Sequence, residues 1–342
     1  MLNNLFKVNK GKVVLYSGED NLGYNHLNYW IPEFVKSGIA PIILTRNNQL
    51  KSCIKNDFRR LDIICAKSAI DVESFFKKRK NISLIFYMSN AANNIHLLRF
   101  NEYQHIFIGT EYFDRDAKVT KMLRAYDELW LTSQASVDKI KPYFDISEIP
   151  IKLIGKPQLK DISKYCKKTP KTVLLKLSAL SFEIKSFLDI LSTLSKKENI
   201  IDIYLSYDIE KINPFAKNIK EQLSEYILFN HSNCNIIDAV SVETINRYEM
   251  VICDVYTYDY RFLTLDTKIY IYIKKNENIS NIFLDKYISI DGLYRFDSAT
   301  ELEEILEKGD FMKEKREAHT EYWMGKKNIT HNQFQNNLKD IV

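Results

Sequence analysis

Several features that would assign a protein of 342 residues to a special class are scarce or absent here. Only 9 glycines and 7 prolines occur, so long disordered or low-complexity segments are not expected. No apolar run approaches the roughly 20 residues that a membrane-spanning helix needs. The stretch 1–12 has no apolar core long enough for a signal peptide. We therefore expect a cytoplasmic protein, and any contact with the inner face of the membrane would be peripheral.

Cysteine and histidine do not form metal-site or redox patterns. The 5 cysteines are odd in number, and no two have C-x-x-C spacing, so reduced thiols in a cytoplasmic protein are expected. The 6 histidines do not cluster with metal-ligand spacing. The sequence therefore predicts no metal and no cofactor.

Common nucleotide-binding and hydrolase motifs are also missing. The sequence contains no P-loop, no G-x-G-x-x-G, no G-x-S-x-G elbow and no H-E-x-x-H. Its net charge is +5, a mild excess that suits an anionic substrate or membrane surface without requiring either. The densest basic run, 77–80, has the character of a solvated helix end. We expect no nucleic-acid partner.

Strands and helices alternate along most of the chain. Apolar runs that predict strands are separated by stretches that predict helices of about ten residues, and this alternation is typical of parallel sheets. The predicted strands are 12–16, 40–45, 61–65, 83–88, 105–109, 128–132, 151–154, 172–177, 200–206, 226–229, 250–253 and 268–273.

The alternation stops once and then restarts, which predicts two domains. We expect a first Rossmann-like domain at 1–155, a linker at 156–171 and a second Rossmann-like domain at 172–310. A helical tail at 311–342 is expected to pack back on the first domain through Tyr322 and Trp323. This is an α/β fold of the GT-B type, with two Rossmann-like domains that face a cleft. In that architecture the donor lies mainly on the second domain and the acceptor mainly on the first, by analogy of fold.

Three stretches, 13–46, 86–140 and 248–272, resemble the CDP-glycerol glycerophosphotransferase family. These are teichoic-acid-type and capsule-type polymerases of bacteria. Asp114, Asp254 and Thr257 occupy positions that match the family's polar loops. The resemblance implies a nucleotide-linked donor, most simply a cytidine nucleotide, and a surface-polymer or lipid-linked acceptor.

The sequence departs from the family at its chemical groups. Thr110 and Glu111 stand where the family has a His-Gly pair, Tyr207 and Asp208 stand where a second histidine is expected, and Arg261 replaces a carboxylate. This chain would therefore be a divergent member that lacks the family histidines.

The candidate catalytic residues follow the strand at 105–109. Glu111 could act as a general base in place of histidine if burial raised its pKa, with Thr110 beside it and Asp114 positioning an acceptor hydroxyl. The alternatives are an inert loop for Thr110 and Glu111, and a helix cap for Asp114.

The candidate donor-binding residues follow the strand at 250–253. Asp254, Tyr256 and Thr257 would form a loop of backbone amides and hydroxyls suited to a pyrophosphate at a helix N-terminus, and Arg261 would add a cation. The alternative is a capped helix with an exposed arginine.

The candidate acceptor-binding residues are Gly18, Asn93 and His96. Gly18 lies in the loop after the first strand, which a ligand could approach closely, and Asn93 and His96 follow the strand at 83–88. A plain turn and an ordinary core or surface histidine are the alternatives.

Three functions fit these observations. The first is a transferase that moves a glycerol-phosphate or sugar-phosphate unit from a CDP-linked donor to a cell-surface polymer precursor such as teichoic acid or capsule. The second is a GT-B glycosyltransferase that uses a UDP- or CMP-sugar. The third is a non-catalytic member of the family that acts as a scaffold or partner. Whether the protein is an enzyme stays open at this point.

Overall fold

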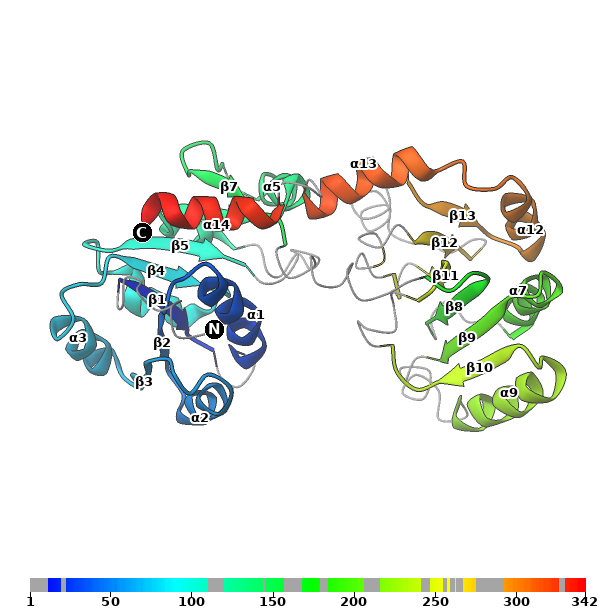
Figure 1. The fold of residues 1–342 in the computed structure, drawn as a ribbon, viewed down its shortest axis with the longest axis horizontal. Helices are drawn as coiled ribbons and strands as arrows, with labels where there is room; N and C mark the ends of the chain where they lie inside the picture. The colour runs from blue at the N-terminus through cyan, green and yellow to red at the C-terminus, as the bar shows by residue number, and fades with distance from the viewer. Residues whose placement is uncertain are drawn as a thin grey trace. The chain divides into compact units, whose positions relative to one another are not determined.

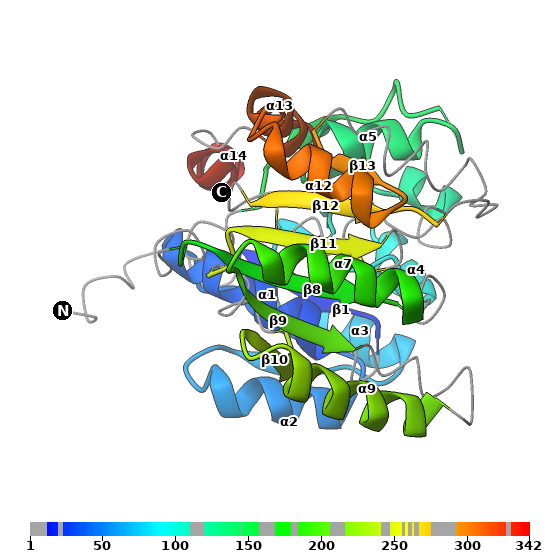
Figure 2. The same ribbon diagram turned by 90° about the vertical axis from the view of Figure 1, so that its right-hand side faces the viewer.

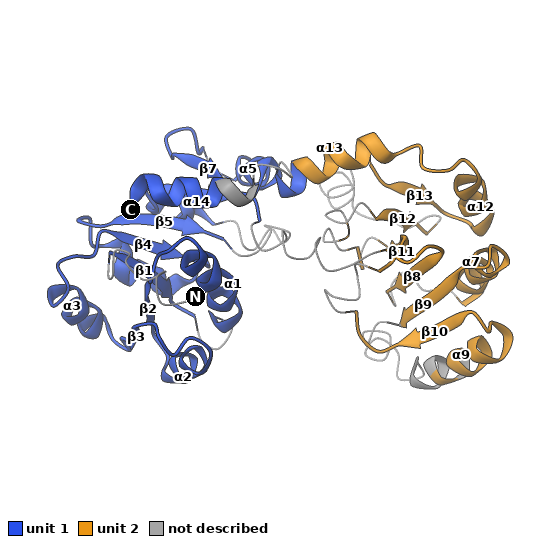
Figure 3. Cartoon of the chain, viewed as in Figure 1, with its two compact units in different colours: residues 1–158, 322–342 blue, residues 159–321 orange. Residues whose placement is uncertain are grey.

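A computed structural model shows two compact units, one formed by residues 1–158 with 322–342 and the other by residues 159–321 (Figure 3). The structure describes residues 12–19, 23–109, 120–143, 145–156, 168–178, 184–205, 216–240, 247–254, 257–258, 262, 267–274, 292–325 and 330–342. Each unit is described by itself below. Within these ranges, no helix combines the length and the apolar character that crossing a membrane requires.

The first unit contains a 7-stranded sheet in the order β3-β2-β1-β4-β5-β6-β7 (Figure 1). All pairings between its described strands are parallel. The strands are β1 (Val13–Ser17), β2 (Ile42–Thr45), β3 (Ile63–Cys65), β4 (Leu84–Tyr87), β5 (Gln104–Ile108), β6 (Glu128–Leu131) and β7 (Ile151–Leu153). Its described helices are α1 (Gly23–Lys36), α2 (Asn48–Asp57), α3 (Ala69–Lys77), η1 (Ala92–Asn94), α4 (Ile95–Leu98), η3 (Lys121–Ala125), α5 (Gln134–Ile140) and α14 (Thr330–Ile341).

Both faces of this sheet are covered by helices. Successive residues of a strand point to opposite faces, and so Val13 and Leu15 belong to one hydrophobic cluster while Val14 and Tyr16 belong to another. The first cluster includes side chains of α1, α2 and α14, and the second includes side chains of α3, α4 and α5. Burial on both faces explains why the strands are apolar runs without polar alternation.

The second unit contains a 6-stranded sheet in the order β10-β9-β8-β11-β12-β13. Its described pairings are also all parallel. Side chains of α7, α9 and α12 share one hydrophobic cluster with the strands, and Figure 2 shows these helices on one face of the sheet. The strands are β8 (Thr172–Leu177), β9 (Ile200–Leu205), β10 (Cys234–Ile237), β11 (Met250–Asp254), β12 (Lys268–Tyr272) and β13 (Tyr294–Phe296). The described helices are α7 (Ile184–Lys196), α9 (Ala216–Asn230), α12 (Ala299–Glu307) and α13 (Lys313–Met324), whose last three residues, 322–324, belong to the first unit.

The expected strand at 226–229 was wrong, because these residues form the last turns of α9. Only Ile227 among the four is buried, and it contributes to the core of the second unit. A run of four apolar residues does not distinguish a strand from a helix end. The strands β10 and β13 and the helix α2 were not expected from the sequence.

The C-terminal helix α14 contributes an aromatic ring to the core of the first unit. Phe334 of α14 is fully buried, and its ring lies 5.2 Å from Trp30, 5.3 Å from Phe34 and 6.1 Å from Trp130, measured between ring centroids. Tyr322 is 39% exposed, and its hydroxyl lies 3.2 Å from Asp138 Oδ2. Packing within the first unit therefore comes from α14, while Tyr322 adds a surface hydrogen bond.

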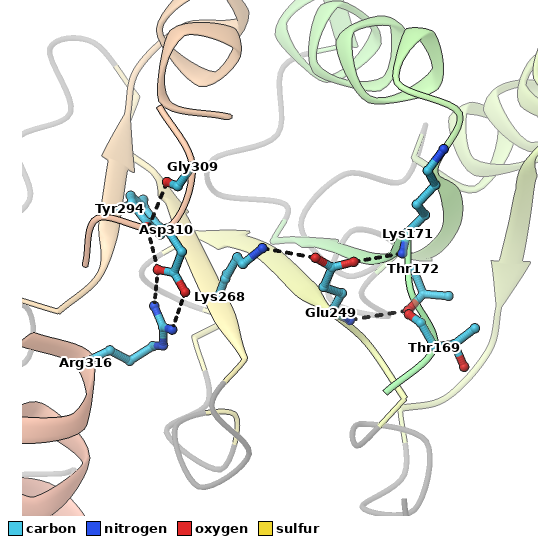
Figure 4. Close-up of polar contacts among 9 residues, drawn as sticks. All are labelled: Thr169, Lys171, Thr172, Glu249, Lys268, Tyr294, Gly309, Asp310 and Arg316. Atoms are coloured by element: carbon cyan, nitrogen blue, oxygen red, sulfur yellow. Dashed lines mark hydrogen bonds and ion pairs between the residues drawn. The ribbon is translucent and has the colours of Figure 1, made fainter. Parts of the chain in front are cut away.

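Two polar networks brace the second unit away from the carboxyl ends of its strands (Figure 4). Glu249, which precedes β11, accepts hydrogen bonds from the backbone N–H of Lys171 at 2.8 Å and from Lys268 Nζ at 3.0 Å. Arg316 of α13 forms a bidentate pair with Asp310, with N–O distances of 2.9 and 2.8 Å, and the Tyr294 hydroxyl donates to the same carboxylate at 2.7 Å. These contacts join β8, β11, β12, β13 and α13 within the unit.

Candidate functional site

Each sheet has one place where the order of its strands reverses. In the first sheet it lies between β1 and β4, because the chain builds outward to β3 on one side and to β7 on the other. In the second sheet it lies between β8 and β11. Ligands of open parallel sheets bind beyond the carboxyl ends of the strands at such a switch point. These two places are therefore the candidate sites of the two units.

Gly18 and Asn93 lie on the two sides of the first switch point and contact each other. Gly18 directly follows β1, and its carbonyl accepts a hydrogen bond from Asn93 Nδ2 at 2.9 Å. The hydroxyl of Tyr16 donates to the carbonyl of Asn93 at 3.2 Å. Two of the three predicted acceptor-binding residues thus tie together the loops that follow β1 and β4.

Gly18 is a glycine because the neighbouring loop approaches it closely. A Cβ atom on Gly18 would lie 2.9 Å from Asn94 Oδ1 and 3.0 Å from Asn93 Cβ. Both distances are shorter than ordinary van der Waals contact, so a side chain would push the loops apart. Glycine at position 18 therefore allows the loops that follow β1 and β4 to approach each other closely.

His96, the third predicted acceptor-binding residue, lies on the short helix α4 and is half-buried. Its carbonyl accepts a hydrogen bond from Arg99 Nε at 3.2 Å. The guanidinium of Arg99 is directed to α3, where it pairs with Glu73 at 2.6 Å. Arg99, one turn after His96, therefore packs against a neighbouring helix.

Sequence reasoning missed several polar groups at the carboxyl edge of the first sheet. Beyond the carboxyl ends of β1, β2 and β6, and in η1 after β4, four buried polar atoms have no hydrogen-bond partner: Glu19 Oε2, Arg46 Nη1, Asn94 Oδ1 and Ser133 Oγ. Burying a polar group without a partner costs free energy, so each such atom calls for an explanation. Nine atoms of this kind occur among the described residues, and four of them lie at this one edge of the first sheet. Four enclosed polar atoms thus lie beyond the carboxyl ends of strands in the first unit, at the edge where ligands of open parallel sheets bind.

The pKa of Tyr16 shows that this edge of the sheet is shielded from water. Burial raises the pKa of Tyr16 to about 12, and the nearby guanidinium of Arg46 offsets part of that shift. Arg46 is held by a hydrogen bond from Nη2 to the carbonyl of Lys67 at 2.8 Å. A cation and a neutral phenol thus lie together at the ends of β1 and β2.

Asp254 organises the second switch point. It ends β11 and is fully buried. Its Oδ2 accepts the backbone N–H of Ser178, which follows β8. Its Oδ1 accepts the backbone N–H of Thr257 at 2.8 Å and lies 2.9 Å from the Thr257 hydroxyl. One carboxylate therefore joins the loops that follow β8 and β11.

Thr257 is fixed by the same arrangement. Its hydroxyl lies 2.7 Å from the carbonyl of Lys176 and accepts the backbone N–H of Asp254 at 3.2 Å. Because both carboxylate oxygens of Asp254 already accept hydrogen bonds, this residue shapes the backbone that would meet a ligand. Asp254 is thus a positioning residue in the part of the site that the structure describes.

Replacing Asp254 with asparagine is expected to destabilise the second unit by about 2–3 kcal/mol. The amide has only one acceptor oxygen, so its NH₂ group would face a backbone N–H at Ser178 or at Thr257. Urea unfolding of both proteins measures the loss. Thr257→Ser, which keeps the hydroxyl, should change stability by less than about 1 kcal/mol. Equal stability of wild type and Asp254→Asn would contradict the role assigned to this carboxylate.

Five predicted site residues lie outside the described residues: Thr110, Glu111, Asp114, Tyr256 and Arg261. Positions 207 and 208 lie outside them as well. The catalytic and donor-binding residues are expected to face each other across the cleft, with Glu111 on the first domain and Arg261 on the second, and this expectation stays a prediction.

His105, the second residue of the strand β5 that precedes Thr110, has a structural role. It is buried, with Nδ1 2.7 Å from the Tyr87 hydroxyl and Nε2 3.0 Å from the carbonyl of Phe100. A carbonyl can only accept, so Nε2 carries the proton and Nδ1 accepts from Tyr87. Burial lowers the pKa of this imidazole. Within the described ranges, no group of histidine, cysteine and carboxylate side chains is arranged to hold a metal ion.

No protein-family model matches the sequence. No curated protein matches it either.

Solved structures do match the whole chain in fold. A UDP-GlcNAc 2-epimerase from Neisseria meningitidis bound to UDP-GlcNAc has a TM-score of 0.60 and 9% identity, covering 96% of this chain and 100% of that one. A glycosyltransferase from Rickettsia africae has a TM-score of 0.54 and 13% identity, covering 97% and 98%. The wall teichoic acid polymerase TagF, soaked with CDPG, has a TM-score of 0.53 and 13% identity, covering 99% and 90%.

At these identities the likeness establishes the fold and leaves the chemistry open. It agrees with the strand orders and with the parallel pairing of both sheets. The chain has an α/β fold with two Rossmann-like domains of the GT-B type, as its sequence predicted.

Proposed function

We propose that this protein is a transferase that binds a nucleotide-linked donor on its second unit and a hydroxyl-bearing acceptor on its first. The observation that carries the proposal is that polar contacts join the loops at the switch point of each sheet. In each unit, polar groups at the carboxyl ends of two adjacent strands are bonded to one another: Gly18 to Asn93 in the first, and Asp254 to Ser178 in the second.

The two edges differ in chemistry, which favours different ligands. At the second edge, Asp254 accepts the backbone N–H groups of Ser178 and Thr257 and so fixes the loops that follow β8 and β11. In the proposal, a pyrophosphate binds other backbone amides of these loops. In the proposal, Tyr256, Thr257 and Arg261 complete this donor site. The first edge carries buried side-chain oxygens and one guanidinium nitrogen of Arg46, all without a hydrogen-bond partner, and a neutral hydroxyl, which can both donate and accept, suits such a mixed edge.

For the donor we propose a CDP-linked glycerol phosphate or sugar phosphate, and for the acceptor a cell-surface polymer precursor. The acceptor hydroxyl would attack the donor's β-phosphorus. A new O–P bond would form, the bond to CMP would break, and CMP would leave with the electron pair. The protein would contribute positioning and neutralisation of developing charge, as in other phosphoryl transfers.

Two observations support the cytidine donor and the cytoplasmic setting of the proposal. The three stretches that resemble the CDP-glycerol glycerophosphotransferases include the loops that follow β1, β4 and β11, and TagF is among the solved structures with this fold. No disulfide joins the described cysteines, which suits a reducing compartment.

A nucleotide panel tests the proposal. Calorimetric titration with CDP-glycerol, CDP, UDP-GlcNAc, UDP and ATP should show binding of the cytidine compounds and no binding of ATP. Thermal unfolding with each compound provides a second measure, because a ligand that binds only the folded state raises the Tm.

The outcomes separate the candidate functions. Binding of UDP-GlcNAc or UDP alone would replace the first candidate with a glycosyltransferase or other enzyme that uses a UDP-sugar, a reading that the fold of the Neisseria epimerase also favours. Absence of binding by every nucleotide would refute the transferase and leave the non-catalytic scaffold.

A further inference from the structure

A cavity of about 330 Å³ lies in the first unit at the amino edge of its sheet, opposite the carboxyl edge that carries the switch-point loops. It is lined by residues 40–42 at the start of β2, by residues 60–62 just before β3, and by Arg79 and Asn81 between α3 and β4. Ligand pockets typically measure about 300–1,000 Å³. The cavity is therefore large enough for a small ligand.

The loop that forms one wall of this cavity is fixed by hydrogen bonds at both ends. Lys55 of α2 donates from Nζ to the carbonyl of Arg59 at 3.0 Å and to the carbonyl of Leu61 at 3.3 Å. The carbonyl of Asp62 accepts a backbone N–H of β2 at 2.8 Å. The backbone that carries Arg60 into the lining of the cavity is therefore held in one position.

The guanidinium of Arg79 is held at the cavity from two sides. Its Nη1 lies 2.6 Å from Asp62 Oδ2, and its Cζ lies 5.2 Å from the centroid of the Phe75 ring, which is a cation–π contact. A guanidinium has five N–H donors in a planar fork, so the contact with Asp62 leaves donors for a ligand. The side chain is 32% exposed, and water or a small molecule can reach it.

Positive charge surrounds this cavity. The segments 59–62 and 77–81, which include the basic run 77–80, carry six cations and one carboxylate, Asp62. The helices α1, α2 and α3 end toward the same edge, and each helix end contributes about −0.5 charge, which the cations exceed. Within the lining, Asp62 pairs with Arg79, and Arg60 adds a net positive charge. The cavity therefore favours an anion.

The lining also indicates the kind of anion. Arginine forks match the oxygen atoms of a phosphate, and a phosphate monoester carries about −1.5 to −2 charge at pH 7. The side chains of Asp62 and Asn81 can hydrogen-bond hydroxyl groups. Among the described residues that line the cavity none is aromatic, so a nucleotide base would have no ring to stack on. A small phosphorylated polyol fits this lining best.

We propose that this cavity is a second ligand site, separate from the candidate site at the carboxyl edge, and that it binds the phosphate ester of a small polyol. Arg60 and Arg79 bind the phosphate, and Asp62 and Asn81 bind hydroxyl groups. The same chemistry occurs in free sugar and polyol phosphates and in the headgroups of glycerophospholipids, so the experiments must distinguish these two sources.

Titration calorimetry with three probes tests the chemistry of the site. Glycerol 3-phosphate should bind wild type, inorganic phosphate should bind more weakly, and glycerol should give no heat of binding. Tighter binding of glycerol 3-phosphate than of inorganic phosphate is the result that the hydroxyl contacts of Asp62 and Asn81 require. Equal binding of the two would overturn these contacts, and binding of glycerol alone would overturn the phosphate site.

Three substitutions locate the binding site. Arg60→Gln and Arg79→Gln should each weaken the binding of glycerol 3-phosphate roughly tenfold or more, because each removes a charge-assisted contact. Arg59→Gln is the matched control, since it removes the same charge from the adjacent exposed residue, which does not line the cavity. It should weaken binding by less than about threefold. Circular dichroism of each variant checks that it is folded.

Vesicles identify the source of the phosphate ester. The protein is sedimented with vesicles of phosphatidylcholine and with vesicles that also contain phosphatidylglycerol. If the ligand is a lipid headgroup, binding to the anionic vesicles is lost in Arg60→Gln, kept in Arg59→Gln and reduced by glycerol 3-phosphate. If the ligand is a free metabolite, Arg60→Gln and wild type sediment equally. Both results support the site and differ only in the source that they assign.

Two results would overturn the proposal as a whole. The first is a wild type that binds neither glycerol 3-phosphate nor inorganic phosphate. The second is an Arg59→Gln variant that loses as much affinity as Arg60→Gln, which would show that the phosphate responds only to the general charge of the surface. The measurements need neither a nucleotide nor turnover, so their outcome is independent of the transferase proposed above.

Discussion

Replacing Phe334 with alanine is expected to lower the free energy of unfolding of the first unit by about 3–5 kcal/mol, the usual cost of removing a buried aromatic ring. Phe334 is fully buried, and its ring packs between those of Trp30, Phe34 and Trp130. The substitution leaves a cavity that these large, rigid rings cannot readily fill. Urea unfolding followed by tryptophan fluorescence measures the loss, because two of the three neighbouring rings are indoles.

Phe229→Ala is the matched control. This phenylalanine also lies near the end of a helix, α9, but it is 89% exposed. Its replacement should change stability by less than about 0.5 kcal/mol. If Phe334→Ala unfolds at the same urea concentration as wild type and Phe229→Ala, then α14 does not contribute to the core of the first unit.

Replacing Arg316 with methionine is expected to destabilise the second unit by about 2–3 kcal/mol. Breaking a fully buried ion pair typically costs about 3–5 kcal/mol, and here the effect is smaller because the Asp310 side chain is 25% exposed. Arg316 itself is 1% exposed, and methionine keeps most of its apolar volume. The loss therefore reports the charge and the two hydrogen bonds to Asp310 (Figure 4).

The Arg316–Asp310 ion pair also predicts that the stability of the second unit depends on pH. Hydrogen bonds from Arg316, followed by the one from Tyr294, lower the pKa of Asp310 to about 2 from an ordinary value of 3.8. Because the folded-state pKa is depressed, the contribution of this carboxylate is fully present above pH 3.8 and is lost as the pH falls toward about 2. Between pH 4 and pH 2, wild type should lose stability more steeply than Arg316→Met.

Arg79→Met is the matched control, because it removes an ion pair that is equally short but exposed to solvent. Arg79 pairs with Asp62 at 2.6 Å, but the two side chains are 32% and 50% exposed. An exposed pair contributes about 0–1 kcal/mol whatever its distance. If Arg79→Met destabilises the protein as much as Arg316→Met does, then burial of the Arg316–Asp310 pair is not the cause of its effect.

The fold class could be predicted from the sequence because both sheets are buried on two faces. Burial makes each strand an apolar run, and parallel pairing places a helix between successive strands. The contribution of α14 could not be predicted in the same way. Its apolar residues Phe334 and Leu338 show that one face is buried, but the sequence does not show which sheet receives them.

The sequence predicted which loops form the candidate site, but it did not predict which side-chain atoms of those loops face the site. Gly18 and Asn93 were identified because they follow strands, and the structure places them together at a switch point. Asn94 and Glu19 lie one residue further along and were missed. Which of two neighbouring side chains turns inward depends on the geometry of a short turn such as η1, and apolar periodicity carries no information on that geometry. The signal that could have found Glu19 is its partner His26, seven positions later in the sequence.

The division of the first unit between the two ends of the sequence sets an order of events during synthesis. The second unit, residues 159–321, can complete its core while the chain is still growing. The first unit cannot complete its core at that stage, because the rings of Trp30, Phe34 and Trp130 pack against Phe334, which is synthesised later. At about 5–20 residues per second, the nascent chain carries this aromatic surface uncovered for on the order of 10–40 seconds after residue 130 has been made. A chaperone that binds exposed aromatic surface would find its target there, and stalled chains that end before residue 334 should aggregate through it.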